Sequence, residues 1–106
     1  MTRSEKVANF IKERAAEFLN QLGNRTSLIT VTAAACSPDL KRATVFISVL
    51  PENKEQTALE FVRRQLTELR NYLKKSMRTK NVPHLQVQID QGEKNRQKID
   101  DLLRNG

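Results

Sequence analysis

The chain has 106 residues, of which 38% are hydrophobic and 5% aromatic, with no tryptophan. This length suffices for one domain with one modest core and is too short for two ordinary domains. A formal net charge of +7 favours a polyanionic partner over a merely solvated surface, because lysine and arginine facing phosphates release counterions and gain affinity.

Several protein classes are excluded by what the sequence lacks. Cys36 is the only cysteine, so neither an intramolecular disulfide nor a cysteine-based metal site can form. The amino terminus is charged and has no apolar region typical of a secretory signal. No run approaches the roughly 18 apolar residues of a membrane span. We therefore expect a soluble, cytoplasmic protein that makes no membrane contact.

Residues 4–22 are expected to form an amphipathic helix, because their apolar residues recur at steps of three and four. This stripe consists of Val7, Phe10, Ile11, Ala15, Phe18, Leu19 and Leu22. Thr2 and Glu5 have the spacing of a capping box, and Gly23 suits the left-handed residue that ends a helix.

Two strands follow, in which apolar residues alternate with others. The residues expected to share a face are Ile29, Val31, Ala33 and Ala35 in the first strand and Ala43, Val45, Ile47 and Val49 in the second. Between the strands, Ser37-Pro38-Asp39 has turn chemistry, because proline presets φ and aspartate hydrogen-bonds its own backbone. Two strands this close in sequence predict an antiparallel hairpin.

A second helix is expected from about residue 53 to residue 77, where Asn53 and Gln56 have the spacing of a cap. Its apolar stripe consists of Leu59, Val62, Leu66, Leu69, Leu73 and Met77. Val82-Pro83 then favours extended backbone, and Leu85, Val87 and Ile89 alternate as a third strand.

The element order α-β-β-α-β predicts an α+β domain over residues 1–90. In this arrangement the helices cover one face of a three-stranded mixed sheet. Residues 91–106 form a C-terminal appendage, suited to a short helix around Ile99, Leu102 and Leu103 or to a partly disordered tail.

No catalytic device is recognisable. His84 is the only histidine and follows Pro83 at a strand edge, where a lone histidine is usually structural or at the surface. The three glycines, Gly23, Gly92 and Gly106, permit neither a P-loop nor a dinucleotide-binding fingerprint. We expect no enzymatic activity, no cofactor, no metal and no small-molecule substrate.

The charges of the second helix are segregated, with acids at its start and bases after them. The helix dipole explains part of this arrangement, but several of the bases lie well before the last turn. At 100° per residue, one stripe beside the apolar face consists of Arg63, Arg70 and Lys74. A second stripe, nearly opposite that face, consists of Arg64, Lys75 and Arg78. Such an arc suits phosphate contacts across a folded RNA, although a solvated face is the simpler alternative. Together with the hairpin, the candidate RNA-binding residues are Arg63, Arg64, Arg70, Lys74, Lys75, Arg78, Lys80, Lys41 and Arg42.

Phe61 and Tyr72 lie off the main apolar stripe of this helix. They are placed either to stack on bases beside the basic arc or to pack against the C-terminal appendage. Packing is the interpretation we favour.

The hairpin resembles that of the ribosome-binding factor A family. The most specific part is Ser37-Pro38-Asp39-Leu40-Lys41, followed by a strand ending Ser48-Val49-Leu50. The passage from Leu69-Arg70 to Val82-Pro83-His84-Leu85 is also similar to the family, as is the tail Ile99-Asp100-Asp101-Leu102-Leu103. The resemblance covers nearly the whole chain.

The resemblance implies a KH-like fold, type II-like, of the α-β-β-α-β kind. The chain has no glycine for a Gly-x-x-Gly loop, which argues against gripping single strands in the usual KH manner. Gln65-Leu66-Thr67 stands where the family carries an Ala-x-Gly signature at a helix kink. The unbroken apolar stripe there favours a straighter helix.

The resemblance also implies a function. It is that of a monomeric ribosome assembly factor that binds the immature small (30S) ribosomal subunit. The factor assists late maturation of 16S rRNA, including its 5′ end, without catalysis, and matters for growth in the cold. The alternatives are a ribosomal structural or translation-regulating RNA-binding protein and, from another class, a small RNA-processing enzyme.

Overall fold

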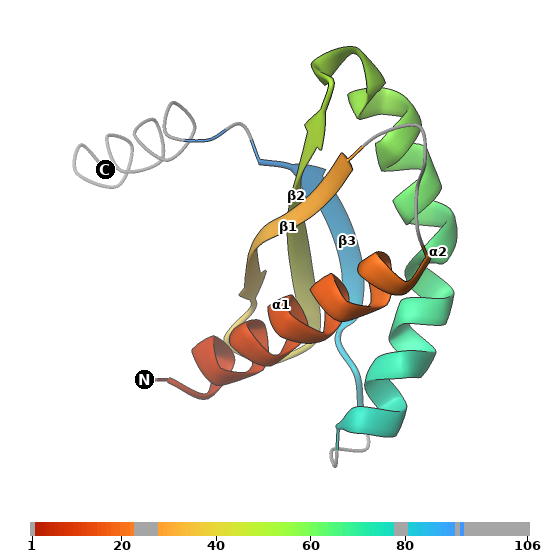
Figure 1. Ribbon diagram of the computed structural model, residues 1–106. Coiled ribbons are helices and arrows are strands. Elements are labelled where there is room, and N and C mark those ends of the chain that lie inside the picture. Colours follow the sequence, from red (N-terminus) through yellow and green to blue (C-terminus); the bar gives the residue numbers. More distant parts are fainter. Residues whose placement is uncertain (1, 23–27, 78–80, 91, 93–106) are drawn as a thin grey trace, which may run out of the picture.

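The computed structural model describes residues 2–22, 28–77, 81–90 and 92. Its elements are α1 (Arg3–Leu22), β1 (Leu28–Cys36), β2 (Arg42–Leu50), the 3-10 turn η1 (Glu52–Lys54), α2 (Glu55–Ser76) and β3 (His84–Ile89). The strands lie in the order β1-β2-β3, with β1 antiparallel and β3 parallel to the central β2. Both helices pack on one face of this sheet (Figure 1), which confirms the predicted two-layer α+β fold.

The start of α1 follows the predicted cap. The Glu5 amide donates to the Thr2 hydroxyl oxygen at 3.2 Å, and the Lys6 amide donates to the Thr2 carbonyl oxygen at 3.1 Å. The Thr2 side chain thereby satisfies the Glu5 amide, one of those that a helix start leaves without partners, and the Lys6 bond is the first of the helix itself. Gly23, the predicted stop, lies outside the described residues.

α2 starts differently from the prediction. The Asn53–Gln56 cap is wrong, because Lys54 holds the cap position and makes no side-chain cap hydrogen bond. The chain instead enters through η1, where the Lys54 amide donates to the Pro51 carbonyl oxygen at 3.0 Å after a cis Leu50–Pro51 peptide. The helix then runs unbroken for 22 residues through Gln65-Leu66-Thr67, as the continuous apolar stripe predicts.

The predicted face of β1 is right for its first half and wrong for its second. Val31 pairs with Ile47 and Ala33 with Phe46, so Thr32 is an extra residue that forms a β-bulge. Beyond the bulge the inward positions shift by one, and Ala34 and Cys36 pack against the core in place of Ala33 and Ala35. The Thr32 hydroxyl donates to an Asp90 carboxylate oxygen at 2.5 Å and to the Phe46 carbonyl oxygen at 3.3 Å.

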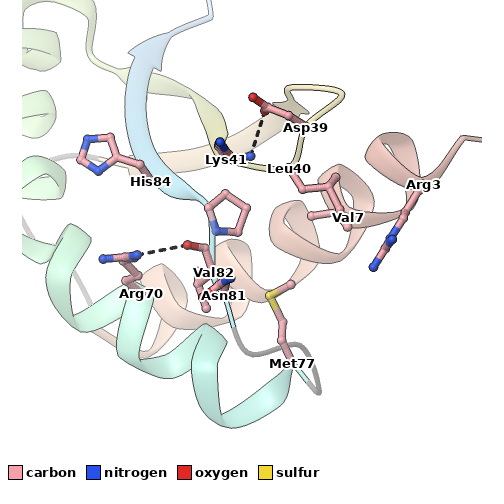
Figure 2. Close-up of a pocket in the computed structure, with 11 residues that line it drawn as sticks. Arg3, Val7, Asp39, Leu40, Lys41, Arg70, Met77, Asn81, Val82 and His84 are labelled. Carbon is pink, nitrogen blue, oxygen red and sulfur yellow. Dashed lines mark hydrogen bonds between the residues drawn. The ribbon is translucent and has the colours of Figure 1, made fainter.

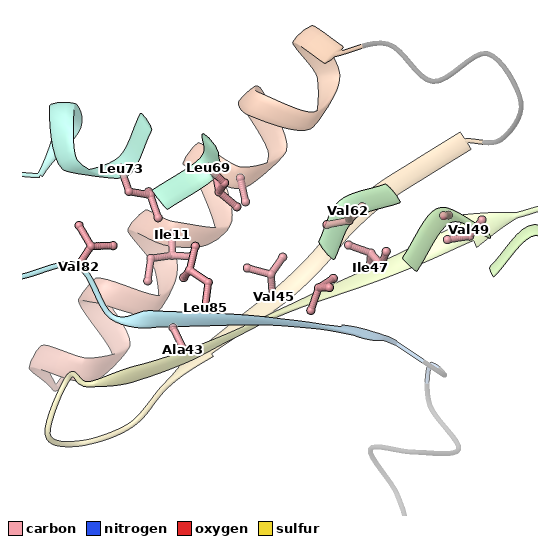
Figure 3. Packing of buried hydrophobic residues seen from close by; sticks show 13 residues of the cluster. Ile11, Ala43, Val45, Ile47, Val49, Val62, Leu69, Leu73, Val82 and Leu85 are labelled. Carbon is pink, nitrogen blue, oxygen red and sulfur yellow. The ribbon is translucent and has the colours of Figure 1, made fainter. Parts of the chain in front are cut away.

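The core between the layers is aliphatic. Alternate residues of β2, from Ala43 to Val49, are buried beneath the helices, as the period of two predicts. The largest fully buried side chains are Ile11, Ile47, Leu69, Leu73, Val45 and Val62 (Figure 3). Among the described residues, no helix combines the length and the apolar content needed to cross a membrane.

Candidate nucleic-acid interface

The described basic residues of α2 are all exposed. We call them the α2 cationic surface, and its members are Arg63, Arg64, Arg70, Lys74 and Lys75. Arg78 and Lys80, also predicted as contacts, lie outside the described residues.

Among the described residues, no carboxylate lies within salt-bridge range of the α2 cationic surface. Within the described part of the chain the salt bridge that forms is Arg14–Glu17, on α1, at 2.8 Å. The Arg64 Nε contacts only a backbone acceptor, the Glu60 carbonyl oxygen, at 3.5 Å. The charge of this surface is therefore available to an anionic partner.

Arg70 has a second role that the sequence does not reveal. Its Nη2 donates to the Val82 carbonyl oxygen at 3.1 Å, and this bond ties α2 to the segment that enters β3. A backbone acceptor leaves no mark in a sequence, so only the structure could identify this contact. Figure 2 shows the guanidinium directed at the Val82 carbonyl oxygen.

The hairpin turn is tightly hydrogen-bonded. The Ser37 amide donates to the Arg42 carbonyl oxygen at 2.8 Å, and the Leu40 amide donates to the Ser37 carbonyl oxygen at 2.9 Å. Asp39 Oδ1 accepts from the Ser37 hydroxyl at 2.6 Å and from the Lys41 amide at 3.1 Å. These two hydrogen bonds, the first most of all, hold the pKa of Asp39 below its usual value. The predicted Ser-Pro-Asp turn chemistry is confirmed.

The two hairpin cations leave the turn in different directions. The His84 amide donates to the Lys41 carbonyl oxygen at 2.8 Å, which fixes Lys41 beside the start of β3. Ala43 faces the helices, so Arg42, one residue earlier, projects from the opposite face of the sheet. The structure therefore brings Lys41 and Arg70 to the same end of the molecule. Arg42 lies on the sheet face that the helices do not cover. Arg63 and Arg64 lie about 10 Å back along α2, given the rise per residue of a helix.

A cleft opens at this end of the molecule, with a volume of about 610 Å³. Its walls come from the start of α1, the hairpin turn, the end of α2 and the segment that enters β3 (Figure 2). Residue spacing could not predict this cleft, because four short segments from distant parts of the chain come together to form it. We call it the end cleft, and its basic residues are Arg3, Lys41, Arg70 and His84.

The described histidine, cysteine and acidic side chains show no catalytic arrangement. His84 is exposed at the start of β3. Burial and, secondarily, the charge of Asp39 raise the pKa of the Cys36 thiol, which favours its unreactive protonated form. Across residues 2–22, 28–77, 81–90 and 92, no three His, Cys, Asp or Glu side chains are grouped to hold a metal ion.

Tyr72 packs against α1. Its ring lies 5.7 Å from that of Phe18, and its hydroxyl donates to Glu17 Oε2 at 3.1 Å. This ring therefore packs within the fold. Packing against the C-terminal appendage stays a prediction, and the packing partner found for Tyr72 is Phe18, which the sequence did not suggest. The C-terminal partners that we expected lie outside the described residues, and Phe61 is half-buried.

The fold and the site together define a class of protein. A three-stranded mixed sheet in the order α-β-β-α-β, with both helices on one face and no glycine in its second helix, is a KH-like domain without the Gly-x-x-Gly loop. The sequence model of the family described as Ribosome-binding factor A matches residues 3–103. The chain belongs to the ribosome-binding factor A family, which confirms the resemblance of its hairpin.

Individual relatives agree with this assignment. Ribosome-binding factor A of Coxiella burnetii is 31% identical over 103 residues, covering 95% of this chain and 87% of the relative. Ribosome-binding factor A of Rhodopseudomonas palustris is 31% identical over 109 residues, covering 98% of this chain and 80% of the relative.

Solved structures confirm the fold. The crystal structure of ribosome-binding factor A from Thermus thermophilus superimposes with a TM-score of 0.71 at 24% identity, covering 81% of this chain and 94% of that chain. A homology model of the Thermus thermophilus factor, fitted into a cryo-EM map of a 30S–RbfA complex, gives a TM-score of 0.70 at 24% identity. It covers 80% of this chain and 92% of that chain.

Proposed function

We propose that this protein is a ribosome assembly factor that binds the immature small ribosomal subunit in the cytoplasm. It assists late maturation of 16S rRNA, including 5′-end processing, and it does so as a monomer and without catalysis. The observation that carries the proposal is the α2 cationic surface, which faces solvent without a described carboxylate in salt-bridge range. Family membership supports the choice of a ribosomal partner, since a Thermus thermophilus relative is described in a 30S complex.

The proposed contacts follow the charge. Two stripes on one helix can contact phosphates on either side of a folded RNA, and such contacts give affinity without reading sequence. Lys41 extends this surface at the hairpin end, while Arg42 reaches a different part of the partner from the other sheet face. The proposed RNA-binding residues are Arg63, Arg64, Arg70, Lys74, Lys75, Arg78, Lys80, Lys41 and Arg42.

Co-sedimentation tests the proposal. Purified protein would be mixed with immature small subunits, mature small subunits and intact translating ribosomes in separate gradients. An assembly factor should sediment with immature or free small subunits and be absent from translating ribosomes. Equal binding to translating ribosomes would instead indicate a permanent structural or translation-regulating component. Binding to none of the three particles would refute the proposal.

A second experiment addresses rRNA maturation. Cells that lack the gene should accumulate 16S precursors with an extended 5′ end, and wild-type protein should restore the mature end. The charge-reversed variant R63E/K74E should fail to restore it at equal protein abundance. Cleavage of precursor rRNA by the pure protein would contradict the non-catalytic part of the proposal.

A further inference from the structure

The end cleft combines apolar walls with basic side chains, a combination that the α2 cationic surface lacks. Its volume of about 610 Å³ lies within the usual range of small-ligand sites, roughly 300–1,000 Å³. Val7, Leu40, Met77 and Pro83 supply apolar surface. A cationic surface for phosphates alone would not need such walls.

Leu40 is the most informative of these residues. Its φ of 62° is left-handed, a conformation that side chains with a Cβ adopt at a cost. It is the fourth residue of the turn that starts at Ser37, and glycine is favoured at that position in the commonest type of such turn. The backbone would be served better by glycine, so the leucine side chain is there for its contacts. This side chain is half-buried and forms part of the cleft wall (Figure 2).

The Arg70 side chain and the backbone that carries Lys41 are held in place beside this wall. The Arg70 guanidinium donates to the Val82 carbonyl oxygen, and the Lys41 backbone is bonded to both Asp39 and His84. Cations that are already positioned lose less conformational entropy when they bind an anion. Among the described residues that line the cleft, Asp39 carries the one carboxylate, and it accepts bonds from Ser37 and Lys41 within the turn.

We infer that the end cleft binds a single unstacked nucleotide of the partner RNA. The base lies against Leu40, Val7 and Pro83, and its phosphate is held by Lys41 and Arg70. Proteins commonly recognise RNA by taking splayed-out bases against apolar or aromatic surfaces, and a mixed apolar and cationic cleft suits this mode. The inference rests on the proposed function, and it adds a specific nucleotide contact to sequence-independent docking through α2.

Mononucleotides provide the first test. The full-length ¹⁵N-labelled protein would be titrated with AMP and UMP, and in parallel with ribose 5-phosphate and inorganic phosphate, while amide shifts are followed by NMR. The nucleotides should shift the amides of Leu40, Lys41 and His84 at lower concentrations than the two ligands without a base. Equal shifts with inorganic phosphate, or shifts confined to the middle of α2, would overturn the inference.

Leu40→Gly separates binding from folding, because glycine accepts the left-handed backbone. Its melting temperature should stay near that of the wild type, while nucleotide affinity falls by about tenfold. Lys41→Ala should cause a loss of similar size, since a charge-assisted bond contributes about that factor. Lys12→Ala, an exposed cation on α1, is the matched control and should leave nucleotide binding unchanged. Should Leu40→Gly fail to fold, Leu40→Asn also tolerates a positive φ and replaces it.

Binding to immature small subunits links the cleft to RNA. Leu40→Gly should weaken this binding severalfold and leave its salt dependence unchanged, because no charge is removed. Full subunit affinity in a variant that no longer binds mononucleotides would show that the cleft is not an rRNA site. The proposed function would survive that result. Failure of the wild-type protein to bind any subunit would refute the proposed function. The mononucleotide titration would still decide whether the end cleft binds a nucleotide.

Discussion

α1 and α2 lie side by side on the same face of the sheet, and both bury an aliphatic stripe, yet they use charge differently. On α1 the Arg14 guanidinium pairs with Glu17 at 2.8 Å and lies 5.2 Å from the Phe10 ring centre, and Glu17 accepts a further bond from Tyr72. On α2, five bases follow the acidic start, with Glu68 as the one acid among them. These bases pair with no described carboxylate.

The contrast distinguishes charge that serves the fold from charge left for a partner. Lys74 and Lys75 in the last turn of α2 also complement the helix dipole, so their position alone decides little. Arg63 stands mid-helix, where the dipole has no such effect, and it is exposed. We therefore expect substitutions on α2 to change RNA affinity and substitutions around Tyr72 to change stability.

Charge reversal on α2 and on α1 should give the largest difference in affinity for immature small subunits. R63E/K74E should weaken binding to immature small subunits by about a hundredfold, because two phosphate contacts become repulsive. The matched control K6E/K12E alters net charge equally on exposed positions of α1 and should cost only a few fold. Filter binding at constant salt measures both affinities. Equal losses would mean that net charge, and not its placement on α2, drives association. Arg70 is avoided in this test because its reversal would also break the bond to Val82.

Salt dependence should sharpen the same contrast. Each phosphate contact contributes about one unit to the slope of log affinity against log salt, so R63A/K74A should lower that slope by about two. K6A/K12A should leave it nearly unchanged. The measurement is a titration of subunit binding over several salt concentrations. An unchanged slope for R63A/K74A would show that neither side chain contacts a phosphate.

Tyr72→Phe should affect the fold and not the partner. It removes the hydroxyl that donates to Glu17 and keeps the ring against Phe18, so it should lower the free energy of unfolding by about 0.5–1 kcal/mol. Urea denaturation measures this change, and subunit affinity should stay at the wild-type value. A loss of affinity at unchanged stability would instead place Tyr72 in the interface.

The smallest effect is expected at Asp39, another charge that serves the fold. Its pKa is lowered in the folded protein, so its carboxylate stabilises the hairpin turn above the ordinary value of 3.8 and this contribution is lost as the pH falls below it. Asp39→Asn should lower the melting temperature slightly at pH 7, and the difference should shrink as the pH falls below 3.8. A difference that persists in acid would mean that the charge is not what stabilises the turn.

Regular periodicity made most of the fold predictable. The buried stripe of α1 and the alternation of β2 follow directly from residue spacing. The second half of β1 differs from the prediction because of the bulge at Thr32. A bulge depends on pairing with the neighbouring strand, and nothing in the sequence around Thr32 predicts it. The start of α2 departed because the 3-10 turn after Pro51 replaced a side-chain cap.

The cationic surface was predictable to the same extent, since an exposed arc on one helix depends only on helical geometry. Contacts between distant segments were not predictable. The bond from Arg70 to the Val82 carbonyl oxygen and the pairing of Tyr72 with Phe18 arise from tertiary packing. Leu40, which lines the end cleft, has a positive φ, and this conformation is not predictable from a leucine in the sequence.

Site-specific crosslinking tests the central claim most directly. A photoreactive amino acid at exposed Asn71 points outward between the two stripes of α2, and the same residue at exposed Glu13 is its counterpart on α1. With immature small subunits, Asn71 should crosslink to 16S rRNA and Glu13 should not. Crosslinking from Glu13 alone would contradict the assignment of α2 as the docking surface.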